Sequence, residues 1–165
     1  MPEHWDYFDR FRERLAHVGA ETVVIGALAA LRYRNEPRAT TDVDFLVTSL
    51  DGVADALVDA GCRVRTVTDD DGAPYVVFAR GDGVQVDALL AETEYQLVAH
   101  RRAVDGFLTV EDVIVHKLIA WRPRDRDDIE SILSVGHDLD VAYIERWADT
   151  WDVTDRWRSV TNPAS

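Results

Sequence analysis

Cysteine, lysine and long apolar runs are all scarce in this 165-residue sequence. The one cysteine, Cys62, excludes an internal disulfide framework and a cysteine-based zinc cluster, and we expect it to be a small buried side chain. No apolar stretch reaches the length of a membrane-spanning helix, and the first six residues lack the basic and apolar regions of a signal peptide. The sequence therefore predicts a globular cytoplasmic protein with no membrane partner.

Positive charge is also in deficit. The chain has 31 acidic and 18 basic residues, a net charge of −13, and only one of the basic residues is a lysine, Lys117. This balance argues against a broad non-specific nucleic-acid surface, which needs a basic stripe. It remains compatible with an anionic substrate, because bound cations can reverse the sign of a small site and arginines can cluster locally.

The pattern of apolar residues predicts an α+β fold in a single domain over residues 1–165. An N-terminal helix is expected within 1–19, from apolar residues at helical spacing (Trp5, Phe8, Phe11, Leu15, Val18). Strands are expected at 22–25, 43–47, 64–68, 75–79 and 84–90, and helices at 27–34, 50–60, 94–104, 110–121, 125–134 and 140–149. Residues 22–90 would form a small mixed β-sheet flanked by helices, and residues 94–157 a mainly helical third.

Three carboxylates stand out because apolar strands hold them. Asp42 and Asp44 are two residues apart, so in a strand they point to the same face and repel each other unless a cation lies between them. Asp87 lies in the apolar strand 84–90 and would supply a third carboxylate to a two-metal site for phosphoryl displacement. Such oxygen ligands suit Mg²⁺ or Mn²⁺. An acidic chain contains D-x-D by chance, however, and the Asp69–Asp71 run is expected to be only a solvated turn.

Gly26 follows the strand 22–25 and begins a predicted helix. Such a junction exposes backbone N–H groups to which phosphates bind, and a glycine lets them approach closely. A tight turn without a ligand gives the same pattern, so both interpretations remain open.

Lys117 lies on the apolar stripe of the helix expected to begin after Thr109, with Asp112 as its capping-box partner. The side chain therefore points toward the core. It either extends past the stripe to water or contacts a phosphate.

Asp125 and Asp128 each lie four residues before an apolar residue, Ile129 and Ile132, and so fall on the buried side of the next helix. Asp127 falls on the outer side. The two buried aspartates either anchor the first helical turn or hold Lys117 or a catalytic water.

Taken in order, these segments resemble the DNA polymerase beta-like nucleotidyltransferase superfamily. The resemblance rests on Gly26-Ala27, on the segment from Arg38 through Asp42-Val43-Asp44 to Val47, and on Val86-Asp87. The segments 108–118 and 124–129 are similar to the AbiEii-like branch of bacterial toxins (type IV toxin-like) and its small relatives. The resemblance spans roughly residues 20–157.

The resemblance implies a role for each motif. The catalytic residues would be Asp42, Asp44, Asp87, Lys117, Asp128 and Asp125, of which the first three would bind divalent metal. The nucleotide-binding residues would be Gly26, Ala27, Arg38 and Lys117. Arg38 is also interpretable as a surface charge in an arginine-rich chain.

The implied activity is Mg²⁺-dependent transfer of a nucleoside monophosphate from an NTP to a hydroxyl of RNA (tRNA), protein or a small molecule, with a toxin–antitoxin pair and a cognate antitoxin as one setting. The chain departs from the family at Ala27, where a serine or glycine is usual. The alternative is therefore a catalytically weak or inactive module of the same fold that binds a nucleotide or a partner protein.

Overall fold

The computed structural model describes residues 2–163, with side chains from residue 7 onward. Its centre is a five-stranded mixed sheet of order β1-β2-β5-β4-β3. The strands are β1 (Thr22–Ile25), β2 (Asp42–Val47), β3 (Arg63–Thr68), β4 (Pro74–Gly81) and β5 (Val84–Leu90). β2 and β5 are parallel and the other neighbouring strands are antiparallel. The predicted α+β class with a mixed sheet is confirmed.

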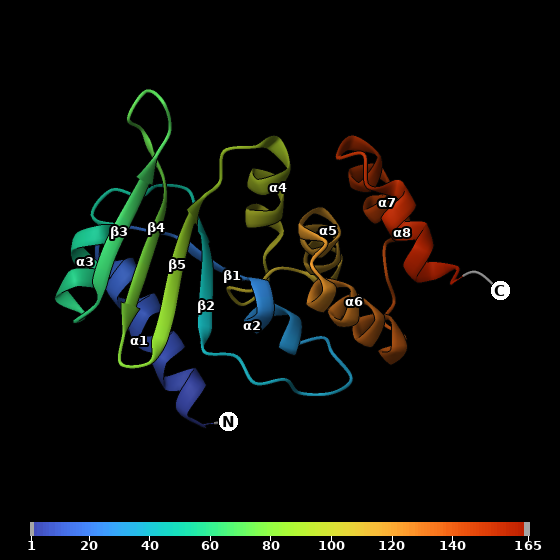
Figure 1. Ribbon diagram of the computed structural model, residues 1–165, viewed down its shortest axis with the longest axis horizontal. Helices are drawn as coiled ribbons and strands as arrows, with labels where there is room; N and C mark the ends of the chain where they lie inside the picture. The colour runs from blue at the N-terminus through green and yellow to red at the C-terminus, as the bar shows by residue number, and fades with distance from the viewer. Residues whose placement is uncertain (1, 164–165) are drawn as a thin grey trace.

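Helices flank this sheet and form the C-terminal third (Figure 1). They are α1 (Pro2–His17), α2 (Gly26–Leu31), α3 (Val53–Asp59), α4 (Glu94–Arg102), α5 (Val110–Ala120), α6 (Pro123–Val135), α7 (Val141–Thr150) and α8 (Thr154–Thr161). The first seven were expected, with bounds that differ by a few residues, whereas α8 was missed. The side chain of Trp5 lies outside the described residues.

One face of the sheet is covered by α1 and α3, which lie behind the strands in Figure 1. Phe8 of α1 packs against Phe45 of β2, with ring centroids 6.1 Å apart, and Phe11 and Leu15 continue the same buried stripe. Each such side chain contributes roughly 1.5–3 kcal/mol through burial. The opposite face carries Asp42 and the residues that alternate with it on β2.

A buried carboxylate, Asp112, ties α4, α5 and α7 together. It accepts hydrogen bonds from the hydroxyls of Tyr95 (3.2 Å) and Tyr143 (2.6 Å) and from Nε of Arg102 (3.2 Å). Thr109 caps α5 by accepting a hydrogen bond from the Asp112 N–H at 3.3 Å, as predicted. The expected reciprocal bond of a capping box is replaced by the Thr109 hydroxyl, which donates to the Asp112 carboxylate at 2.8 Å. This satisfied network fixes α5, the helix that carries Lys117.

The expectations for Cys62 and for the Asp69–Asp71 run are confirmed as well. Cys62 is buried, and Asp69–Asp71 form an exposed turn between β3 and β4. Over the described residues, no helix is long and apolar enough to cross a membrane.

Candidate active site

Strand register brings the three predicted carboxylates onto one face of the sheet. Asp42 and Asp44 alternate with the buried Val43 on β2, so they project together. On the parallel neighbour β5, Asp87 is the direct partner of Asp44, one inter-strand spacing of about 4.8 Å away. The proximity expected from the D-x-D pattern and the third aspartate is therefore present.

The surroundings of Asp44 disfavour its negative charge. Burial, and then the charges of Asp87 and Asp42, raise the pKa of Asp44 to about 6. Burial also raises the pKa of Asp87, although a hydrogen bond from Gln85 opposes this. Gln85 Nε2 donates to Asp87 Oδ2 at 2.9 Å, while Asp87 Oδ1 is buried without a hydrogen-bond partner among the described residues. A bound cation would reduce the repulsion among the carboxylates, and it would also give Asp87 Oδ1 a partner.

As the side chains are placed, no group of three His, Cys, Asp or Glu within the described residues is arranged to hold a metal ion. Asp42 Oδ1 accepts a hydrogen bond from the Thr41 hydroxyl at 3.4 Å, and Asp87 is engaged by Gln85. The donor set nevertheless fits Mg²⁺ or Mn²⁺ chemically, because it consists of three mutually repelling carboxylates with one orphaned oxygen. Metal binding by these residues remains a prediction.

Gly26 lies directly against Asp44. Its φ of +67° belongs to the left-handed region, and a Cβ at this position would lie 2.2 Å from Asp44 Oδ2. Only glycine fits both constraints without displacing the carboxylate. The sequence suggested that Gly26 lets a phosphate approach the backbone closely. In this structure the group that lies against Gly26 is the Asp44 side chain.

A cavity of about 590 Å³ opens where the sheet face meets α5 and α6. Five of the predicted residues line it: Gly26, Asp44, Asp87, Lys117 and Asp125. The aromatic residues Tyr75 and Phe78 of β4 also line it. The other four predicted residues do not line this cavity. Asp42 lines another hollow, of about 470 Å³, and neither hollow is lined by Ala27, Arg38 or Asp128. A nucleotide in the cavity would thus not touch every residue expected to bind it.

Lys117 is buried, with 4% of its surface exposed, so of the two alternatives left open it does not extend to water. Its Nζ lies 2.6 Å from Asp128 Oδ2 and 3.3 Å from Asp125 Oδ1. Both aspartates face inward on α6 as predicted, and Asp127 is exposed. Both roles left open for the aspartates are present: the two residues hold Lys117, and Asp125 also anchors the first turn of α6 through the backbone N–H of Arg122.

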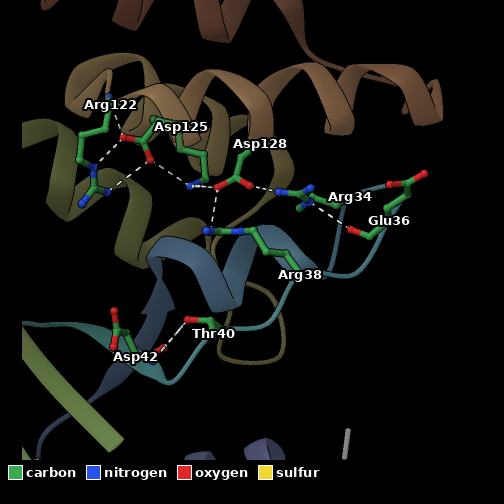
Figure 2. A network of polar contacts seen from close by, with 9 residues as sticks. Arg34, Glu36, Arg38, Thr40, Asp42, Arg122, Asp125 and Asp128 are labelled. Atoms are coloured by element: carbon green, nitrogen blue, oxygen red, sulfur yellow. Dashed lines mark hydrogen bonds and ion pairs between the residues drawn. The ribbon is translucent and has the colours of Figure 1, made fainter.

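Arginines surround the same two aspartates (Figure 2). Asp128 pairs with Arg34 and, at 3.3 Å, with Nη2 of Arg38. Asp125 accepts hydrogen bonds from Nε of Arg122 at 2.8 Å and from its backbone N–H at 2.9 Å. Burial would raise the pKa of Asp125, but these bonds and the charge of Lys117 hold it below its usual value.

Lys117, Arg34, Arg38 and Arg122 place four positive charges against two carboxylates, a positive cluster beside the acidic sheet face. Arg38, expected at a triphosphate, contacts Asp128 instead in this structure, and its Nε is buried without a hydrogen-bond partner among the described residues.

Some site residues were missed from the sequence. Arg34 and Arg122 were lost among many arginines, although the position of Arg122 just before Pro123 marks a helix start. His116 also lines the cavity; burial lowers its pKa to about 4, so it is neutral at pH 7, and its Nε2 has no partner among the described residues. The one feature of the sequence that could have pointed to His116 as a site residue is its position next to Lys117.

Solved structures identify the class of fold. ANT(2'')-Ia in complex with adenylyl-2''-tobramycin matches 92% of this chain and 97% of its own at 13% identity, with a TM-score of 0.61. JHP933 from Helicobacter pylori matches 94% and 80% at 15% identity, with a TM-score of 0.55. A predicted nucleotidyltransferase from H. pylori matches 96% and 80% at 15% identity, with a TM-score of 0.56. The chain therefore has the nucleotidyltransferase fold.

No protein-family model and no curated protein sequence matches the chain. The likeness to the solved structures is one of fold, and the assignment to the AbiEii-like branch remains a prediction.

Proposed function

We propose that the protein is a nucleotidyltransferase that moves a nucleoside monophosphate from an NTP to an acceptor hydroxyl. The observation that carries the proposal is the register of β2 and β5, which sets Asp44 opposite Asp87 beside Gly26, on the wall of a cavity that also contains Lys117. The nucleotidyltransferase fold supports it.

In the reaction, the acceptor oxygen forms a bond to the α-phosphorus and the bond from that phosphorus to the bridging oxygen of the β-phosphate breaks. Pyrophosphate leaves with the bonding electron pair. The hydroxyl proton passes to the carboxylate of Asp87, which lies beside Asp44 on the same face of the sheet. Atoms and charge balance as NTP plus acceptor giving a phosphodiester and pyrophosphate, with one proton released.

Asp42, Asp44 and Asp87 would hold Mg²⁺ or Mn²⁺, which neutralises phosphate charge during such transfers. Lys117 and Arg122, at the cavity wall, would face the triphosphate and stabilise the departing pyrophosphate. Asp125 and Asp128 act as positioning residues, because they fix Lys117 through its ammonium group.

The acceptor and the cellular setting are the open parts of the proposal. The fold neighbour ANT(2'')-Ia was solved with an adenylylated aminoglycoside, which supports a small-molecule hydroxyl. The resemblance of residues 108–118 and 124–129 to AbiEii-like toxins is the ground for proposing tRNA as an acceptor, with an antitoxin partner and a cytoplasmic location. One observation favours an inactive nucleotide-binding module instead: Ala27 has no hydroxyl to offer a phosphate or metal.

Label transfer from [α-³²P]NTPs in the presence of Mg²⁺ or Mn²⁺ tests the activity, with bulk RNA, protein and small hydroxyl compounds as acceptors. We expect transfer by the wild type and a loss of at least 100-fold in Asp42→Asn, because the remaining carboxylates could not hold the metal. Asp70→Asn, in the exposed turn, is the matched control. Equal transfer by Asp42→Asn and wild type would reject the assignment, and nucleotide binding without pyrophosphate release would favour the inactive module.

A further inference from the structure

The sheet face that carries the carboxylates continues into a basic half. Residues paired across neighbouring strands point to the same face, so the register can be followed from strand to strand. One row runs through Asp42, Gln85, Arg80 and Arg63, and the next through Asp44, Asp87, Phe78 and Arg65. At about 4.8 Å per strand, the two β3 arginines lie about 10 Å from β5. We call Arg63, Arg65, Arg80 and Phe78 the basic half.

The arginines of the basic half form no close ion pair among the described residues, although the charge of Arg80 acts on Asp87 at longer range. All three arginines are exposed, and over the described residues none forms an ion pair with an aspartate or glutamate. Arg63 lies directly opposite Arg80, an arrangement that destabilises an antiparallel pair by itself. In a chain of net charge −13, such a cluster of unpaired arginines is suited to bind an anion.

The shape of this region is that of a binding surface. Two hollows of about 470 and 490 Å³ share Arg63, Arg80 and Gln85; the first also includes Asp42 and the second includes Phe78. Asp82, in the β4–β5 turn, lines the first hollow as well. The Arg65 guanidinium lies 4.7 Å from the centre of the Phe78 ring, forming a flat cationic and aromatic platform.

The position of the basic half relative to the carboxylates assigns its ligand, given the function proposed above. Lys117 and Arg122 approach Asp44 from α5 and α6, the side on which the triphosphate would lie. In a phosphoryl displacement the attacking and leaving oxygens lie on opposite sides of the phosphorus. The acceptor therefore approaches from the other side of Asp44, across Asp87 and Phe78, where it meets the three arginines.

We propose that the acceptor is itself a nucleotide, either free or at the end of a single strand. Its phosphate lies against Arg63 and Arg80, its base stacks on the Arg65–Phe78 platform, and its hydroxyl reaches the α-phosphorus beside Asp87. An amine-rich acceptor such as an aminoglycoside would meet like charge on this surface, in contrast to the ligand of the fold neighbour ANT(2'')-Ia.

Acceptor binding can be measured apart from transfer. Fluorescence anisotropy of a fluorescein-labelled single-stranded tetranucleotide would give its affinity, and calorimetry with CMP would give that of a free nucleotide. We expect the double variant Arg63→Gln/Arg80→Gln to weaken whichever ligand the wild type binds by at least tenfold, while the affinity for a non-hydrolysable NTP stays within twofold. The matched control is Arg101→Gln/Arg158→Gln, two exposed arginines distant from this face. Equal binding by double variant and control would overturn the proposal.

Transfer assays separate this proposal from the proposed function. With CMP, the tetranucleotide and tobramycin as competing acceptors, we expect label on CMP or the tetranucleotide, and the labelled product distinguishes a free nucleotide from a strand end. Label on tobramycin alone would overturn the nucleotide acceptor while leaving nucleotidyl transfer intact. Absence of transfer to every acceptor would reject the proposed function, and the binding measurement would still decide whether the basic half is a nucleotide site.

Discussion

At the scale of single residues, Asp44 is the carboxylate of the site whose ionisation is most disfavoured. Burial and two neighbouring carboxylates oppose its ionisation, and Gly26 leaves just enough room for its side chain. Such an arrangement lowers the stability of the metal-free protein, which is a common property of sites built for a ligand rather than for the fold. The strain gives a measurable dependence of stability on pH.

In EDTA, Asp44→Asn should stabilise the protein at pH 7.5. The folded-state pKa of Asp44 is about 6 against an ordinary value of 3.8, so the stability associated with protonated Asp44 is complete below about pH 4 and is lost as the pH rises through 6. The asparagine side chain of Asp44→Asn does not ionise, so the variant keeps this contribution to the free energy of unfolding, which is at most about 3 kcal/mol. Urea unfolding of both proteins between pH 4 and 7.5 measures it.

The gain should shrink as the pH falls toward 4 and vanish only below it, where Asp44 is protonated in both the folded and the unfolded chain. Asp70→Asn, in the exposed turn, should show no such pH dependence. A variant that is equally stable as, or less stable than, the wild type at pH 7.5 would show that the charge on Asp44 is not disfavoured by its surroundings.

At the scale of elements, α5 and α6 are joined by charge as well as by apolar packing. Lys117 on α5 pairs with Asp125 and Asp128 on α6, and Arg34 and Arg38, on the segment between α2 and β2, pair with Asp128. Helical periodicity predicted the inward direction of Lys117 and both aspartates, because that direction depends only on local spacing. It could not reveal the contacts of Arg34 and Arg38, whose partner lies about 90 residues away.

Asp128→Asn should destabilise the protein by about 3–5 kcal/mol, because it leaves three cations around a buried position without their shared carboxylate. Asp127→Asn is the matched control on the same helix, since Asp127 is exposed, and should change stability by less than about 0.5 kcal/mol. Urea unfolding at pH 7.5 compares the two. Similar values would mean that the cluster is not a stabilising feature of the α5–α6 pair.

At the scale of the whole molecule, acidic and basic groups are separated across one face of the sheet. The sequence pattern predicted the α+β class and nearly all elements, since apolar periodicity and turn residues are local signals. The sequence also predicted that the three carboxylates belong to one site, because the D-x-D pattern and the apolar strand around Asp87 are local signals too. It did not predict the basic half, because Arg63, Arg65 and Arg80 become neighbours of Asp42 and Asp87 only through the strand order β2-β5-β4-β3.

The short helix α8 illustrates another limit. Its stretch is polar, and no side chain caps its N-terminus, so it lacks the usual start signal. It is held by tertiary contacts instead: Trp157 and Val160 are buried, and Nη1 of Arg156 donates to the backbone carbonyls of Leu118 and Ile119 at the end of α5.

The central claim is that the carboxylates of the sheet face bind a divalent metal for nucleotidyl transfer. Titration with Mn²⁺ at pH 7.5, with free Mn²⁺ followed by electron paramagnetic resonance in the presence of a non-hydrolysable NTP, tests it most directly. We predict uptake of Mn²⁺ by the wild type and by Asp70→Asn, and at least tenfold weaker uptake by Asp44→Asn. Equal uptake by Asp44→Asn and the wild type would contradict the claim.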